Sequence, residues 1–134
     1  MVGISSKGVY GLAAMYVLAH AVNQRSMQVR EVAAMTQISH GYLEQLLSQL
    51  RKSGLVNSTR GANGGYKLSR KAHDITVLEI IEALEGPLFH VDGNRGASLI
   101  LESFWSEMED KVRKLFALKL SDVDQMFQPY HFEI

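Results

Sequence analysis

The chain has 134 residues, of which 46% are apolar, and this composition is typical of one globular domain rather than of a disordered segment. It contains no cysteine, which excludes disulfides, thiolate zinc sites and cysteine-bound iron–sulfur clusters. The net charge is zero, but residues 1–75 have nine Lys and Arg against three acids (+6), whereas residues 76–134 have five against eleven (−6). A basic half indicates either a module that binds a polyanion or chance clustering on a solvated surface.

Neither a membrane span nor a secretory signal is predicted. No apolar run reaches the roughly 18 residues that a bilayer crossing requires. Residues 1–7 have no charged segment followed by an apolar block, which a signal peptide would need. We therefore expect a cytoplasmic protein.

Two helices are predicted at the start of the basic half. Ser5 and Ser6 can cap the first, which begins near Lys7. A short helix is expected over about residues 29–35, and residues 36–39 read as a tight turn after it. The residues that recur at helical spacing along the first helix are Val9, Leu12, Ala13, Tyr16, Val17 and His20.

A third helix is predicted from Ser39, which is a good N-cap residue, to about Ser53. Gly54 lies where a left-handed C-terminal cap is expected. Four leucines at positions i, i+3, i+4 and i+7 form one stripe that the helix would bury: Leu43, Leu46, Leu47 and Leu50.

A β-hairpin is predicted after the third helix. Residues 55–59 and 66–69 are typical of two short strands, and residues 60–65 between them form a turn rich in glycine, which tolerates positive φ. Helix, short helix, turn, helix and glycine-tipped hairpin are the element order of a winged helix-turn-helix. The sequence therefore predicts a mostly α fold with a two-stranded wing.

Two longer helical segments are predicted in the acidic half. Thr76 caps a helix that ends at Glu85, and residues 88–96 read as a loop. A long helix is expected over about residues 97–120, with apolar positions that step by three and four like a coiled-coil seam. A last short helix would follow, capped by Ser121 and Asp122 and ending at Phe127. The residues expected to form a dimer interface on the long helix are Leu101, Phe104, Trp105, Met108, Val112 and Leu115.

The third helix carries hydrogen-bonding side chains opposite its leucine stripe, and they are Tyr42, Gln45, Ser48, Gln49 and Lys52. Such side chains reach base edges or phosphates when a helix lies in a DNA groove. The unpaired N–H groups at the start of the helix favour phosphate as well. Glu44 either accepts from cytosine N4 or forms a surface ion pair with Arg51 or Lys52. Tyr42 either contacts DNA or covers the turn, and Arg60 can approach a groove at the hairpin tip.

The sequence resembles the Rrf2 family of bacterial transcriptional regulators over about residues 3–87. The matching motifs are SKGxYGL from Ser6, YLEQL from Tyr42, GLVxSxRGxxGGYxL from Gly54 and ITxxEIIxxLEGP from Ile75. This resemblance implies a homodimer that reads an imperfect palindrome, with the helix from Ser39 in the major groove and the wing in the minor groove. The residues expected to bind DNA are Lys7, Ser39, His40, Tyr42, Glu44, Gln45, Ser48, Lys52, Arg60, Gly61 and Tyr66.

Members of this family that bind an iron–sulfur cluster have three cysteines between the fourth helix and the long helix, and this sequence has none there. It is most similar to the branch that represses cysteine-metabolism genes, whose members also lack these cysteines and end in aromatic residues and Ile. The resemblance implies cysteine synthase (O-acetylserine thiol-lyase) as a partner, with contacts from Tyr130, Phe132 and Ile134. Packing of the same tail on the dimer is the alternative.

The expected function is that of a dimeric DNA-binding repressor of sulfur or cysteine genes, with residues 1–87 as the DNA-binding domain and residues 88–134 as dimerisation helix and tail. No enzyme is expected, because no nucleophile–base set, phosphate loop or metal set is present. No cofactor or metal is expected either, since the five histidines lack ligand spacing. Two alternatives stay open: a regulator of another stress or small-molecule response, and a subunit that acts mainly on cysteine synthase.

Overall fold

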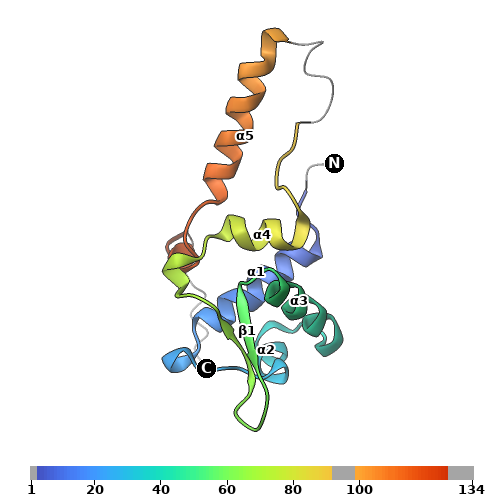
Figure 1. Ribbon diagram of the computed structural model, residues 1–134, viewed down its shortest axis with the longest axis vertical. Helices are drawn as coiled ribbons and strands as arrows, with labels where there is room; N and C mark the ends of the chain where they lie inside the picture. Colours follow the sequence, from blue (N-terminus) through green and yellow to red (C-terminus); the bar gives the residue numbers. More distant parts are fainter. Residues whose placement is uncertain (1–2, 92–98, 127–134) are drawn as a thin grey trace.

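The computed structural model describes residues 3–91 and 99–126 and confirms a mostly helical fold with one two-stranded sheet. The elements are α1 (Ser6–Ala19), η1 (Val22–Gln24), α2 (Val29–Thr36), α3 (His40–Lys52), β1 (Val56–Thr59), β2 (Gly65–Leu68), η2 (Ala72–Asp74), α4 (Val77–Glu85), α5 (Glu102–Phe116) and η4 (Leu120–Met126). Figure 1 shows α5 projecting away from the other helices, with the β1–β2 hairpin at the opposite end of the longest axis. Among the described residues, no helix is long and apolar enough to cross a bilayer.

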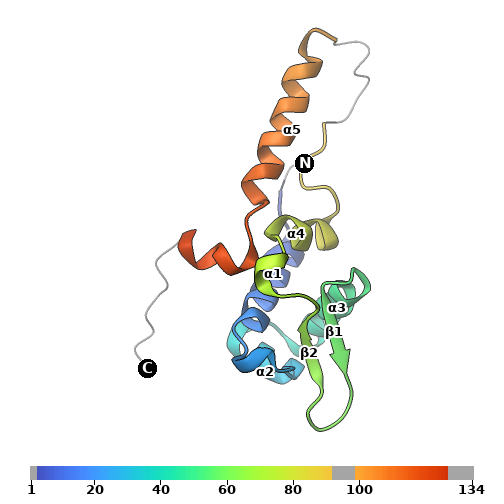
Figure 2. The same ribbon diagram turned by 60° about the vertical axis from the view of Figure 1, so that its left-hand side comes forward.

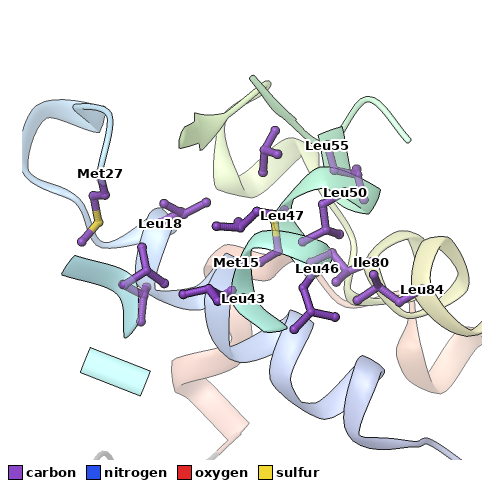
Figure 3. Packing of buried hydrophobic residues seen from close by; sticks show 14 of the residues in the cluster. Met15, Leu18, Met27, Leu43, Leu46, Leu47, Leu50, Leu55, Ile80 and Leu84 are labelled. Carbon is purple, nitrogen blue, oxygen red and sulfur yellow. The ribbon is translucent and has the colours of Figure 1, made fainter. Parts of the chain in front are cut away.

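The core forms where α3 packs against α1 and α4 (Figure 3). The predicted leucine stripe of α3 is confirmed, since each of its four leucines is at most 2% exposed. Met15 from α1 and Ile80 from α4 are fully buried against them. Burial of a leucine of this kind stabilises the fold by roughly 1.5–3 kcal/mol, so the stripe fixes the position of α3 and leaves its opposite side to solvent.

The buried side of α1 differs from the side that the apolar spacing predicts. Val9 is 55% exposed, and of the predicted residues only Val17 is fully buried. The other buried residues of α1 are Gly8, Gly11, Ala14, Met15 and Leu18. The two glycines allow α1 and α4 to approach closely, because a Cβ atom at Gly11 would lie 2.0 Å from Leu84 Cδ1. The pattern misses this face because α1 carries apolar residues on both sides, and the two glycines on the buried side do not count as apolar positions.

Glu85 at the end of α4 caps the start of α1. Its carboxylate accepts hydrogen bonds from the N–H and hydroxyl of Ser5 and from the N–H of Gly8, the last at 2.9 Å. These bonds, with Lys7 nearby, hold the pKa of Glu85 below its usual value. The stabilisation is therefore present at neutral pH and is lost as the pH falls through the lowered pKa.

The hairpin is held against the segment that precedes α2. β1 and β2 are antiparallel, with Val56 opposite Leu68, and the N–H and carbonyl of Tyr66 exchange 2.8 Å hydrogen bonds with Met27. Gly65 has φ of +138°, and a Cβ atom there would lie 2.2 Å from the Met27 carbonyl oxygen. The amide of Gln28 also donates to the Ala62 carbonyl at the hairpin tip, at 3.3 Å. These contacts fix the hairpin relative to α2 (Figure 2).

The long helix is shorter than predicted. α5 begins at Glu102, after a 3₁₀ turn at residues 99–101, and the part of the prediction that covers residues 97–98 lies outside the described residues. The helix ends at Phe116 rather than near Leu120 because the next residues pair with the backbone before α4: Val77 N–H donates to Leu118, and Leu120 N–H donates to Ile75. The last helix is a 3₁₀ helix that starts at Leu120.

Most of the surface of α5 is left uncovered by the rest of the described chain. None of its residues is buried, and Leu101, Phe104, Trp105 and Leu115 are between 37% and 73% exposed. Met108 and Val112 are half-buried. Two ion pairs join residues four apart along α5, Glu107–Lys111 and Asp110–Lys114, and Arg113 pairs with Glu82 of α4.

Candidate nucleic-acid interface

A polar hollow lies along the exposed side of α3. We call it the α3 hollow, and its volume is ≈ 950 Å³. Because the leucines of α3 face the core, the residues half a turn away point into this space. They are Gly41, Glu44, Gln45, Ser48, Gln49 and Lys52, with Tyr66 of β2 on the wing side. The structure therefore brings together five of the predicted DNA-binding residues in one concave surface beside the hairpin.

Gln49 makes a contact that the sequence does not predict. Its side-chain amide donates to the carbonyl of Ala83 in α4, at 3.1 Å. Gln49 thus helps to hold α3 on α4 while it also lines the α3 hollow, and this partner comes from 34 residues away. The helical pattern places Gln49 near the boundary between buried and exposed sides, where spacing alone does not decide its direction.

Tyr42 connects the start of α1 to α3. Its ring packs edge-on against Tyr10, with centroids 5.9 Å apart, and its hydroxyl lies 3.4 Å from the Ser6 hydroxyl. These contacts with α1 leave Tyr42 half-buried, and its contact with DNA stays a prediction. Lys7, which follows Ser6, is exposed.

The N-terminus of α3 is open to solvent. Ser39 has the extended backbone of an N-cap residue, as predicted, but its side chain makes no capping hydrogen bond. His40 and Glu44 lie one helical turn apart on the same side, with Nδ1 and Oε1 separated by 3.9 Å. Both side chains are more than half exposed. The ion pair of Glu44 with Arg51 or Lys52, which was the structural alternative, is absent among the described contacts.

The hairpin tip carries one long cationic side chain on a turn of small residues. Arg60 is exposed, and Gly61 after it has φ of +107°, a backbone conformation that favours glycine. Gly61 lines a second, smaller hollow together with His40, so the hairpin tip and the start of α3 are neighbours. A tip with so few side chains allows close approach of the backbone to a ligand.

The remaining predicted residues lie apart from this surface. The proposed dimer residues are on α5, at the far end from the hairpin (Figure 1). Tyr130, Phe132 and Ile134 lie outside the described residues. No group of three or more His, Asp or Glu that could hold a metal ion is found within residues 3–91 and 99–126.

An open polar helix face, a hairpin fixed beside it and a basic N-terminal half define a winged-helix DNA-binding protein. Comparison with known proteins gives the family. The model of the Rrf2 family, described as an iron-dependent transcriptional regulator, matches residues 4–124. The chain therefore belongs to the Rrf2 family of transcriptional regulators.

Its relatives and structural neighbours agree with this assignment. The transcriptional regulator CymR of Bacillus subtilis is 38% identical over 112 residues, which are 84% of this chain and 81% of CymR. The structure described as CymR, the global cysteine regulator of B. subtilis, is similar with a TM-score of 0.82 at 36% identity, and the match covers 95% of this chain and 99% of that one. The regulator IscR of Cereibacter sphaeroides is 42% identical over 71% of this chain and 63% of IscR.

Proposed function

We propose that the chain is a homodimeric repressor that reads a palindromic operator in the bacterial cytoplasm. The observation that carries the proposal is the separation of two unpartnered surfaces. The polar α3 hollow and the hairpin lie at one end, and the exposed apolar side of α5 lies at the other. In this division, residues 1–87 bind DNA and residues 88–134 provide the dimer contact and the tail.

The dimer contact follows from the physical chemistry of α5. Apolar side chains that repeat along an amphipathic helix gain free energy only when another surface covers them. Contiguous apolar patches are rare on monomers and mark interaction sites. A second copy of α5 offers the same stripe, and two-fold symmetry then places two wings on a palindrome.

In this function Glu44 and Gln45 specify bases, while Arg60 and Gly61 enter the minor groove. Lys7, Ser39, His40, Tyr42, Ser48, Lys52 and Tyr66 hold the protein on the backbone. Both Glu44 and Gln45 line the α3 hollow and are exposed, which supports their assignment. A carboxylate accepts from cytosine N4 and is repelled by the acceptor atoms of guanine, so it discriminates between bases rather than adding affinity.

Glu44→Ala is therefore expected to relax discrimination at one base position of each half-site by about 1–3 kcal/mol. Non-specific affinity should change little. Binding-site selection from a random duplex library measures this, with Glu107→Ala on α5 as a control that removes an acid far from the interface. A mutant consensus identical to that of the wild type would refute the role of Glu44.

We further propose that the target genes serve sulfur or cysteine metabolism and that cysteine synthase delivers the signal. The likeness to a protein described as the global cysteine regulator of B. subtilis supports the first part. The absence of cysteine from the sequence supports a signal other than a cysteine-bound cluster. Operator affinity measured with and without the synthase tests the proposal: it should change with the enzyme, and O-acetylserine should cancel the change. An affinity that the synthase leaves unaltered would contradict it.

Removing Ile134 is expected to abolish binding of the synthase and to leave operator affinity nearly intact. The reason is that an apolar residue with its carboxylate can enter an enzyme cleft and be held by backbone donors. Calorimetric titration of the full chain and the shortened chain against the synthase measures the difference. If the tail packs on the dimer instead, the deletion will lower the melting temperature and weaken operator binding, and both chains will bind the enzyme equally.

A further inference from the structure

A second hollow lies between α2, α3 and the hairpin. We call it the wing hollow, and its volume is ≈ 280 Å³. None of its lining residues lines the α3 hollow, so it is a separate feature of the same side of the molecule. The lining residues are Gln28, Val29 and Arg30 from the start of α2, His40 from α3, and Thr59, Gly61, Gly64 and Gly65 from the hairpin.

The wing hollow is cationic. Arg30 and His40 are its ionisable lining residues, and no acid lines it. Two acids lie beside the lining residues. The Glu44 Oε1 atom lies 3.9 Å from His40 Nδ1, so the positive charge offered to a ligand is that of Arg30. Glu31 is held elsewhere: Arg25 donates to both of its carboxylate oxygens, and Gln28 N–H donates to one at 3.1 Å. These bonds lower the pKa of Glu31 to about 2. The charge of Arg30 also contributes to lowering the pKa of Glu31, but no salt bridge of Arg30 is found among the described residues. Its side chain is exposed and therefore accessible to a ligand.

The walls of the wing hollow are rigid and free of bulky side chains. The Met27–Tyr66 hydrogen bonds and the Gln28–Ala62 hydrogen bond connect α2 to the hairpin on either side of it. At Gly64 a Cβ atom would lie 2.4 Å from the Thr59 carbonyl oxygen, so the turn is tight and its backbone forms the wall. A basic concavity whose wall is glycine backbone lets an anionic group come close to that wall.

The geometry of DNA identifies that group. When α3 occupies the major groove and the wing occupies the adjacent minor groove, the strand that separates the two grooves must pass between α3 and the wing. The wing hollow lies in that interval, because it is bounded by the start of α3 on one side and by the hairpin on the other. The strand presents a phosphodiester at each nucleotide, and a guanidinium binds phosphate oxygens in bidentate fashion.

We infer that Arg30, with His40 beside it, binds a backbone phosphate of the strand between the two grooves. The contact of Arg30 then adds the same affinity for every DNA sequence, and it fixes where the wing and α3 lie along the duplex. Since phosphate contacts fix register without reading bases, the contact would orient Glu44 and Gln45 over their base pairs. The inference rests on the proposed DNA-binding function and adds to it a residue that the sequence pattern does not single out.

Arg30→Gln tests the inference, with Lys71→Gln as a control that removes an exposed positive charge from η2, outside the wing hollow. The Arg30 variant should bind operator and unrelated duplex about tenfold more weakly than the wild type, by the same factor for both. The slope of log affinity against log salt should fall by about 1. Arg30→Lys should restore the salt slope and only part of the affinity, because lysine keeps the positive charge but cannot form the two parallel hydrogen bonds of a guanidinium.

Duplexes that each carry one neutral methylphosphonate locate the phosphate. In the wild type, one substitution in each half-site should reproduce the tenfold loss, and the same substitution should have no effect on the Arg30→Gln variant. Added inorganic phosphate, at ionic strength matched with chloride, should not compete; competition that disappears in the variant would mean that the hollow takes a free anion and would overturn the assignment. Wild-type affinity and salt slope in Arg30→Gln would also overturn it while leaving the proposed function standing. A wild type without preference for any sequence would instead contradict the proposed function itself.

Discussion

Met108→Asp is expected to separate the dimer and to lower affinity for a palindromic operator by about 10²–10⁴-fold. The reason is that two independent monomers, rather than one dimer, must then bind the two half-sites. Met108 lies in the middle of the apolar side of α5, between Phe104 and Val112. A carboxylate placed there would have to be desolvated on association without a partner. Binding to an isolated half-site should change little, since α5 projects away from α3 and the hairpin (Figure 1).

The matched control is Ser106→Asp, which adds the same charge to the same helix on its exposed polar side. Sedimentation of both variants measures the association state, and circular dichroism verifies that α5 is still helical. A Met108→Asp protein that sediments as a stable, folded dimer would contradict the proposed interface. If the variant does not fold, Leu115→Lys near the end of α5, where the side chain is 73% exposed, is the second test.

Gly65→Ala is expected to destabilise the protein by about 2–4 kcal/mol, the largest effect of a single methyl group that the fold predicts. Two costs add. The φ of +138° is one that only glycine adopts without strain, and the new Cβ atom would meet the Met27 carbonyl at 2.2 Å. Relief of that contact requires β2 to move away from Met27 and so breaks the two 2.8 Å hydrogen bonds that Tyr66 makes with it.

Gly54→Ala is the appropriate comparison, because Gly54 also has positive φ, +80°, but has open space around its Cα atom. It should cost only about 1 kcal/mol. Chemical denaturation of the two variants measures the difference, and DNA binding adds a second readout, since a detached wing should weaken binding even where the protein is folded. Equal stability of the two variants would show that contact with Met27 does not hold the hairpin.

The sequence predicts the features of this fold that depend on local spacing. The leucines of α3 repeat with the helical period and are buried, and Gly54 has the left-handed conformation of a helix end. Thr76 caps α4 through its side chain as expected. Each of these follows from neighbours within a few residues, where periodicity and capping preferences operate.

The features that the sequence does not predict depend on residues far apart in the chain. Gly11 is buried because Leu84 lies against it, and Gln49 turns inward because the Ala83 carbonyl needs a donor. α5 stops at Phe116 because the following backbone pairs with residues 75–77. No local pattern contains these partners, and the spacing of α1 therefore predicts a buried side that is wrong at Val9.

The candidate interface shows the same division. The exposed side of α3 follows from its leucine stripe, so Glu44, Gln45 and Ser48 could be predicted and lie together in the α3 hollow. Arg30 could not be predicted as part of the interface, because only the docking of the hairpin on α2 brings Arg30 beside Gly61 and His40. A signal was nevertheless available: Arg30 is a basic residue in the first turn of the helix that opens the helix-turn-helix, a position close to the DNA backbone in such motifs.

The most direct test of the central claim is to sequence the DNA that the purified full-length protein retains from a random duplex library. The account predicts an inverted repeat whose half-site centres lie whole helical turns apart, in multiples of about 10.5 base pairs, because two α3 helices must enter the major groove on one side of the duplex. The retained sites should be lost as salt is raised, since phosphate contacts contribute much of the affinity. Retained DNA without any enriched motif, or with a single half-site and no symmetry, would contradict a dimer that reads a palindrome.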